Sequence, residues 1–92
     1  MEQKEILSQA IHKYGVEKQE NQCIEECAEL TTALLHLRRG KCQPADVITE
    51  IADVIIMCEQ MKLIYGTAIV DEEVKRKVEK LKKNLGYVSN EK

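Results

Sequence analysis

Hydrophobic residues recur along this chain with the spacing of an α-helix. Between residues 2 and 14, successive apolar side chains lie one, three, one and three positions apart, which places them on one face of a helix. We expect Gly15 to stop this helix, because glycine readily adopts the left-handed conformations found at helix ends. A second helix is predicted from about residue 19 to Arg39, after a short link at residues 15–18.

The second predicted helix is apolar on two sides. One row consists of Ile24, Ala28, Thr31 and Leu35, and a second row consists of Leu30, Ala33, Leu34 and Leu37. A helix that is apolar over so much of its circumference lies at the centre of a bundle or at a subunit interface. The pattern therefore predicts neighbours on both sides of this helix.

Two more helices are predicted after it. Pro44 suits the first turn of a third helix, which runs to about Tyr65. Asp71 is expected to cap a fourth helix that ends at Gly86. The apolar stripe of the fourth helix consists of Val70, Val74, Val78, Leu81 and Leu85. Since no segment has the alternation typical of a strand, the chain is predicted to be all-α, a four-helix bundle forming one domain over residues 1–92.

The size of the chain limits how much core such a bundle has on its own. A chain of 92 residues buries only roughly 60–65% of the surface that it exposes when unfolded. We therefore expect homo-oligomerisation to complete the bundle. No apolar run approaches the ~20 residues that span a bilayer, and the polar start of the chain does not resemble a signal peptide. These features predict a cytoplasmic protein with no membrane partner.

Charge is distributed unevenly along the chain. Residues 17–30 carry five Glu against one Lys, whereas residues 75–83 carry five Lys and one Arg against one Glu. An acidic segment facing a positively charged one suits a site for a metal ion and a phosphate. A solvated helix face would equally explain the lysines of residues 75–83. A nucleic-acid partner is not expected, because the chain is acidic overall and has no groove-reading motif.

The cysteines have no paired CxxC spacing. They are Cys23, Cys27, Cys42 and Cys58. Cys23 and Cys27, four residues apart, would bind zinc together with a histidine, but these spacings match no common zinc motif. Free thiols acting as small apolar side chains are the favoured interpretation.

Two pairs of carboxylates lie inside the apolar helices. Glu26 and Glu29 form one pair and Glu50 and Asp53 the other, and residues three apart share a helix face. The two pairs lie within about one helical turn of the same level if the second and third helices are antiparallel. Four converging carboxylates need a cation, and oxygen ligands favour Mg²⁺, Mn²⁺ or Ca²⁺.

Two other interpretations of these carboxylates were weighed. They would be ordinary surface residues if each were solvated or paired with a lysine. A di-iron bundle would require Glu-x-x-His, but neither His12 nor His36 follows a glutamate by three residues. Ligation by oxygen alone therefore favours Mg²⁺.

The order of these motifs resembles a known family. Glu25-Glu26-x-x-Glu29 followed by Glu50-x-x-Asp53 is similar to the signature of the MazG-type all-α nucleoside triphosphate pyrophosphohydrolases. The lead Tyr14-Gly15-x-Glu17-x-Gln19 and the run Ile51-Ala52-Asp53-Val54-Ile55-Ile56 also resemble that family. The resemblance covers about residues 10–85.

The resemblance implies a function and a set of roles. The family hydrolyses (deoxy)nucleoside triphosphates to the monophosphate and pyrophosphate, using Mg²⁺, with Mn²⁺ as an alternative ion. The residues implied as metal ligands are Glu26, Glu29, Glu50 and Asp53. Catalytic roles are implied for Glu25 and Glu26, where Glu25 either supports the ligands or activates water.

The same resemblance suggests how the substrate is held. Lys77 and Lys80 occupy the positions that contact phosphates, although Leu81 stands where the family often has a polar residue. The chain has no Trp or Phe to stack on a base, so Tyr14 and Gln19 are the main candidates, with His12 and Gln22 also available. Family members of this size are dimers or tetramers, and a homotetramer is favoured here.

Two further functions were considered. A phosphoribosyl-ATP pyrophosphohydrolase belongs to the same superfamily, but residues 53–58 lack the histidine-containing run of those enzymes. A non-enzymatic helical interaction module would agree with the small size and the missing stacking aromatics. The sequence does not name the nucleotide.

Overall fold

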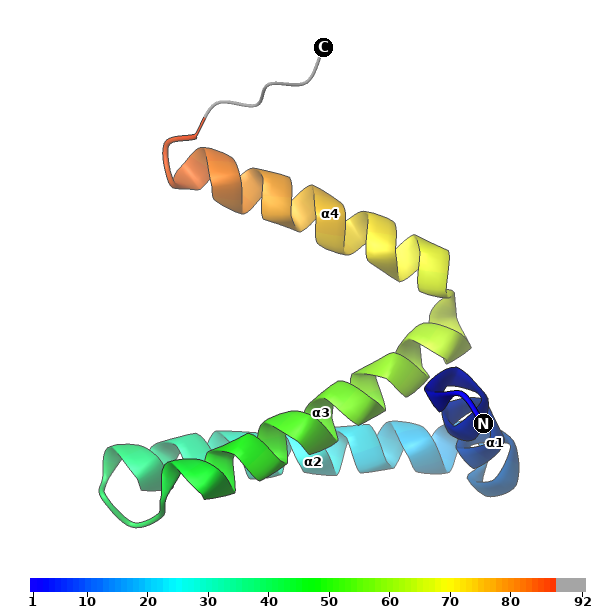
Figure 1. Cartoon of the computed structure of the whole chain (residues 1–92), viewed down its shortest axis with the longest axis horizontal. Helices are drawn as coiled ribbons and strands as arrows, with labels where there is room; N and C mark the ends of the chain where they lie inside the picture. The colour runs from blue at the N-terminus through cyan, green and yellow to red at the C-terminus, as the bar shows by residue number, and fades with distance from the viewer. Residues whose placement is uncertain (88–92) are drawn as a thin grey trace.

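The computed structural model describes residues 1–87, and its secondary structure over these residues is helical (Figure 1). The four helices are α1 (Gln3–Tyr14), α2 (Val16–Arg38), α3 (Pro44–Tyr65) and α4 (Thr67–Asn84). The predicted all-α class with four helices is therefore confirmed. The bounds predicted for the third helix agree with α3.

Helices α2 and α3 form an antiparallel pair, and α1 lies across one end of it (Figure 1). The short loop before α3 is fixed by a capping box, in which the Gln43 backbone N–H donates to Asp46 Oδ2 at 2.8 Å. Pro44 occupies the first turn, where it has no helical hydrogen bond to donate. The short loop forces α3 to return along α2.

One row of α2 packs against α3 along the length of the pair. Its members are spaced four, three, four and three residues apart, as in a coiled-coil seam, and are Gln19, Cys23, Glu26, Leu30 and Ala33. The buried side chains of α3 are Val47, Met57 and Gln60. We call the row of α2 residues from Gln19 to Ala33 the seam, and it contains polar as well as apolar residues.

A buried hydrogen bond crosses the seam near one end. Gln19 Nε2 donates to Gln60 Oε1 at 2.8 Å, and the two side chains are only 7% and 4% exposed. Because an unpaired buried amide is costly, this bond favours the one alignment of α2 and α3 that forms it. It thereby fixes which residues lie opposite one another along the pair.

Two predicted helix starts were wrong, and both errors have the same cause. Helix α2 begins at Val16 rather than near residue 19, and α4 begins at Thr67 rather than after Asp71. Gly15 and Gly66 have φ angles of 94° and 113°, so each turns the chain within a single residue and leaves no room for a longer link. Asp71 lies inside α4 and forms an ion pair with Lys62 of α3 at 2.8 Å.

Helix α4 diverges from the rest of the chain after the turn at Gly66 (Figure 1). Within residues 1–87 it contacts α3 alone among the helices. Apart from the half-buried Val70, its apolar stripe is consequently exposed, from 53% at Val74 to 67% at Leu85. The radius of gyration is 16.6 Å, compared with roughly 12 Å for a compact domain of this length. One chain therefore does not close a four-helix bundle by itself.

The Gln19–Gln60 bond gives a prediction about stability. Gln19→Leu should lower the free energy of unfolding by about 1–3 kcal/mol, because it leaves the buried Gln60 Oε1 without its donor. The double variant Gln19→Leu/Gln60→Leu should recover much of this loss, since neither amide then remains. Urea denaturation of the variants, with exposed Gln3→Leu as the control, measures both effects. If the double variant lost as much free energy of unfolding as the two single variants combined, the two amides would not depend on each other and the prediction would be wrong.

Candidate metal centre

Three carboxylates from α2 and α3 meet across the seam. One oxygen from each of Glu26, Glu29 and Glu50 lies within 4.8 Å of the other two. Glu26 and Glu29 share one face of α2, and the antiparallel return of α3 brings Glu50 opposite them. The structure thus brings together three of the four residues predicted as metal ligands.

The remaining acidic candidates lie at the edge of this cluster. Asp53 follows Glu50 by one turn of α3, is half-buried, and contacts the Glu50 carboxyl closely enough to influence its pKa. Glu25 is exposed, and its charge also reaches the Glu29 carboxyl. Both residues therefore add negative charge at the edge of the cluster.

Repulsion between carboxylates and partial burial both disfavour negative charge in the cluster. The Glu26 carboxylate, and then that of Glu50, raises the pKa of Glu29 above its ordinary value. Partial burial raises the pKa of Glu50, and the neighbouring carboxylates of Asp53 and Glu26 add to the effect. Both shifts mean that the fold disfavours the charged forms of these groups.

Glu26 carries an unpaired oxygen at the centre of this repulsion. Its Oε2 accepts a hydrogen bond from Gln22 Nε2 at 3.1 Å. Its Oε1 is buried, and none of the described residues donates to it. Because a buried carboxylate oxygen needs a positive or donating partner, a cation fits this position.

The donor set also fits Mg²⁺. Carboxylate oxygens are the protein ligands that this ion prefers, and oxygens on opposite sides of an Mg²⁺ ion are roughly 4 Å apart. The separation of up to 4.8 Å is close to that value. Small side-chain rotations would therefore suffice for Glu26, Glu29 and Glu50 to hold one ion together.

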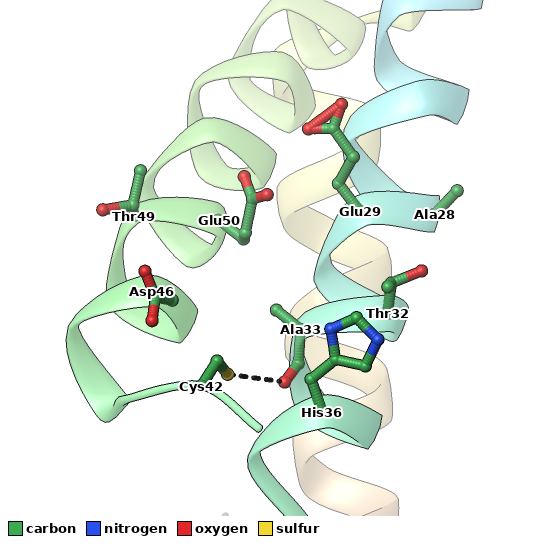
Figure 2. Close-up of a pocket in the computed structure, with 9 residues that line it drawn as sticks. All are labelled: Ala28, Glu29, Thr32, Ala33, His36, Cys42, Asp46, Thr49 and Glu50. Atoms are coloured by element: carbon green, nitrogen blue, oxygen red, sulfur yellow. Dashed lines mark hydrogen bonds between the residues drawn. The ribbon is translucent and has the colours of Figure 1, made fainter. Parts of the chain in front are cut away.

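A groove of about 560 Å³ lies beside the cluster, between α2 and α3. Figure 2 shows Glu29 and Glu50 at one end of it and Cys42 and His36 near the α2–α3 loop. The Cys42 thiol donates to the Ala33 carbonyl at 3.5 Å and closes that end. The groove is lined by Ala28, Glu29, Thr32, Ala33, His36, Cys42, Asp46, Thr49 and Glu50.

The groove next to the carboxylates was not predicted from the sequence. Thr32 and His36 lie three and seven residues after Glu29, which puts all three on one helix face. This spacing was a usable signal for His36. The contribution of Asp46 and Thr49 depended on the short loop and the return of α3, which no spacing within α2 reveals.

The predicted phosphate-binding lysines lie apart from the carboxylates within one chain. Lys77 and Lys80 are exposed residues of α4, which diverges from the α2–α3 pair (Figure 1). Lys77 Nζ lies 3.9 Å from Glu73 of the same helix. A role for these lysines at the cluster would require α4 of another chain.

The two residues predicted to bind the base lie in different environments, one exposed and one buried. Tyr14 is exposed at the end of α1, with the ammonium groups of Lys13 and Lys18 at 5.4 and 5.3 Å from its ring centre. The amide of Gln19 is buried and bonded to Gln60. The structure therefore gives Gln19 a packing role and leaves Tyr14 accessible.

No family model, no curated protein and no solved structure matches this chain. Among the described residues, no helix has the combination of length and apolar character needed to cross a membrane. The functional interpretation consequently depends on the site itself.

The raised pKa values of Glu29 and Glu50 predict how stability depends on pH. Between the ordinary value of 4.5 and the raised pKa, the native state holds more protons than the unfolded state. The free energy of unfolding of the metal-free protein should therefore fall as pH rises through this window. Glu50→Gln should flatten this fall and raise the melting temperature at pH 7.

Thermal denaturation between pH 4.5 and 8 with a chelator present measures both effects. Glu72→Gln, which removes one charge from an exposed position on α4, is the matched control and should leave the pH dependence unchanged. A Glu50→Gln protein that melts below the wild type at pH 7 would show that the cluster is not under repulsion.

Proposed function

We propose that this chain is a Mg²⁺-dependent nucleoside triphosphate pyrophosphohydrolase. The observation that carries the proposal is the convergence of Glu26, Glu29 and Glu50 around a buried carboxylate oxygen to which no residue of the described chain donates a hydrogen bond. A cluster of this kind is costly without a cation and suited to Mg²⁺ with one. The order and spacing of the two acidic motifs support the same function.

The chain's own residues have distinct roles in this reaction. Glu26, Glu29 and Glu50 would hold the ion, and Asp53, one turn from Glu50, would add a further carboxylate at its edge. When bound, Mg²⁺ would neutralise negative charge on the triphosphate. Glu25, exposed next to the cluster, accepts the proton of the attacking water as the bond between the α-phosphate and the pyrophosphate breaks. The products are the nucleoside monophosphate and pyrophosphate.

The groove beside the cluster suits the nucleoside part of such a substrate. Its volume of about 560 Å³ lies within the range of roughly 300–1,000 Å³ typical of small-molecule sites. His36 offers an aromatic ring for stacking, and Thr32 and Thr49 offer hydroxyl groups. These residues are better placed for the nucleoside than Gln19, whose amide is already bonded.

We further propose that identical chains associate to cover α4. The chain exposes 7433 Å², compared with roughly 5,400 Å² for a compact monomer of its mass. Association would bury the apolar stripe of α4 and place its basic residues, Lys77 and Lys80 among them, near the acidic α2–α3 pair of another chain. A homotetramer is favoured over a dimer. A cytoplasmic location agrees with the four free cysteines.

Hydrolysis of nucleotides tests the proposed reaction directly. Purified protein should release pyrophosphate from some members of a panel of NTPs, dNTPs and phosphoribosyl-ATP, and only when Mg²⁺ or Mn²⁺ is present. Glu50→Gln should reduce the rate by more than the roughly 10–100-fold that is typical when a residue outside the ligand shell is lost. Asp53→Asn should reduce the rate by a factor within that range, and Glu72→Gln should leave the rate unchanged.

The outcomes separate the competing functions. Release of pyrophosphate from phosphoribosyl-ATP alone would favour a phosphoribosyl-ATP pyrophosphohydrolase. No release from any substrate, together with no effect of Mg²⁺ on the melting temperature, would favour the interaction module. A fully active Glu50→Gln protein would refute the site assignment.

Light scattering coupled to size-exclusion chromatography tests the association. Wild-type protein should elute with the mass of a tetramer, and the double variant Val78→Asp/Leu81→Asp should elute as a smaller species, because buried charges oppose association. Lys75→Asp/Glu72→Lys, which reverses two exposed charges of α4 without touching the apolar stripe, is the control. A monomeric wild-type protein would contradict the proposal.

A further inference from the structure

The groove beside the acidic cluster is lined by one carboxylate that does not belong to the cluster. Asp46 lies in the first turn of α3 and lines the groove from that side, whereas His36 lines it from α2 (Figure 2). Because Glu50 follows Asp46 by four residues, the two share a helix face and lie about 6 Å apart along α3. Asp46 is therefore one turn beyond the proposed metal ligands, towards the α2–α3 loop.

The charge of Asp46 is not neutralised by any residue that the structure describes. Its Oδ2 accepts the backbone N–H of Gln43 at 2.8 Å, and the side chain is exposed. None of the ion pairs formed among residues 1–87 includes Asp46. No lysine or arginine lines the groove. This end of the groove therefore carries a negative charge that remains when the cluster holds a cation.

The other groove side chains offer few donors to a ligand. The Thr49 hydroxyl already donates to a backbone carbonyl of α3 at 3.1 Å, so its oxygen is left as an acceptor. The Cys42 thiol donates to a backbone carbonyl of α2. Away from the metal ligands, Thr32 and His36 are the remaining lining side chains with an O–H or N–H group. The groove therefore favours a ligand edge that donates hydrogen bonds.

This end of the groove is also where the base of a bound nucleotide would lie. His36 follows Glu29 by seven residues, so it is two helical turns, or about 10 Å, from the cluster along α2. With the triphosphate at the metal ion, the sugar would occupy the first part of this length and the base the part beyond it. A base stacked on His36 would then have an edge facing α3, where Asp46 lies (Figure 2).

We propose that Asp46 makes the site selective for bases with an exocyclic amino group, which are cytosine, adenine and guanine, over uracil and thymine. The selectivity rests on the proposed reaction, because it concerns the nucleoside part of the same substrate. An exocyclic amino group donates to a carboxylate in a charge-assisted hydrogen bond. Uracil and thymine carry a carbonyl oxygen where cytosine carries its amino group, and a carboxylate repels that oxygen.

Nucleotides that differ in the amino group test this selectivity. In the pair dCTP and dUTP, and in the pair ATP and inosine triphosphate, a carbonyl replaces the amino group. GTP and inosine triphosphate form a third pair, in which the amino group is absent from the second member. In at least one pair, kcat/KM with Mg²⁺ should be about 10-fold higher for the nucleotide with the amino group, as expected for one hydrogen bond to a charged group.

Asp46→Asn should bring this ratio of kcat/KM values to one or below. The amide oxygen of the new side chain still accepts the Gln43 N–H, whereas its NH₂ group donates to a base carbonyl. Gln43→Ala is the matched control, because it removes the Gln43 side chain from the same capping box and keeps the Asp46 carboxylate. It should lower the melting temperature and leave the ratio unchanged. If Asp46→Asn lowered kcat/KM equally for both members of a pair, its role would be structural and the proposal would be wrong.

Calorimetric binding of nucleoside monophosphates with Mg²⁺ separates a failure of this selectivity from a failure of the proposed reaction. CMP should bind more tightly than UMP, or AMP or GMP more tightly than IMP, and Asp46→Asn should abolish the difference. Hydrolysis with equal kcat/KM values within every pair would overturn the role of Asp46 and leave the reaction in place. If no nucleotide were hydrolysed, the reaction would be refuted, and equal or undetectable binding within every pair would then overturn the selectivity as well.

Discussion

The packing of α2 against α3 is the constraint on which the rest of this structure depends. Its register is fixed at one end by the short loop before Pro44 and near the other by the buried bond between Gln19 and Gln60. A shift of one turn along the seam would leave both amides buried without partners. The same register that satisfies these amides forces the carboxylates of Glu29 and Glu50 together.

The seam therefore contains two opposing electrostatic features. The amide pair is satisfied within the chain, whereas the acidic cluster is not, because its carboxylates repel one another and Glu26 Oε1 has no donor. Evolution towards stability alone would replace one of these glutamates by an apolar residue. Under the proposed function, their presence in the helix pair is explained by the negative charge that binding a cation would require.

Sequence reasoning recovered the features that depend on helix periodicity. The bounds of α3 and the convergence of Glu26, Glu29 and Glu50 followed from spacing and a short loop. The start of α4 and its direction did not, because they depend on the backbone angles of Gly66, and a glycine in a sequence does not reveal which angles it adopts. The groove at His36 was missed because part of its lining comes from the α2–α3 loop and from α3.

The direction of α4 and the charge of the acidic cluster both call for contact with a second chain. Within the part of the chain that the structure describes, the helix with the largest number of lysines contacts α3 alone among the helices, and no residue donates to Glu26 Oε1. A triphosphate with its Mg²⁺ would still carry excess negative charge beside Glu25 and Asp53, so cationic side chains are needed there. In the proposed assembly, the exposed stripe of α4 would supply the driving force for association, and its flanking lysines would supply the charge. Covering the apolar surface and completing the site would therefore be two consequences of the same contact between chains.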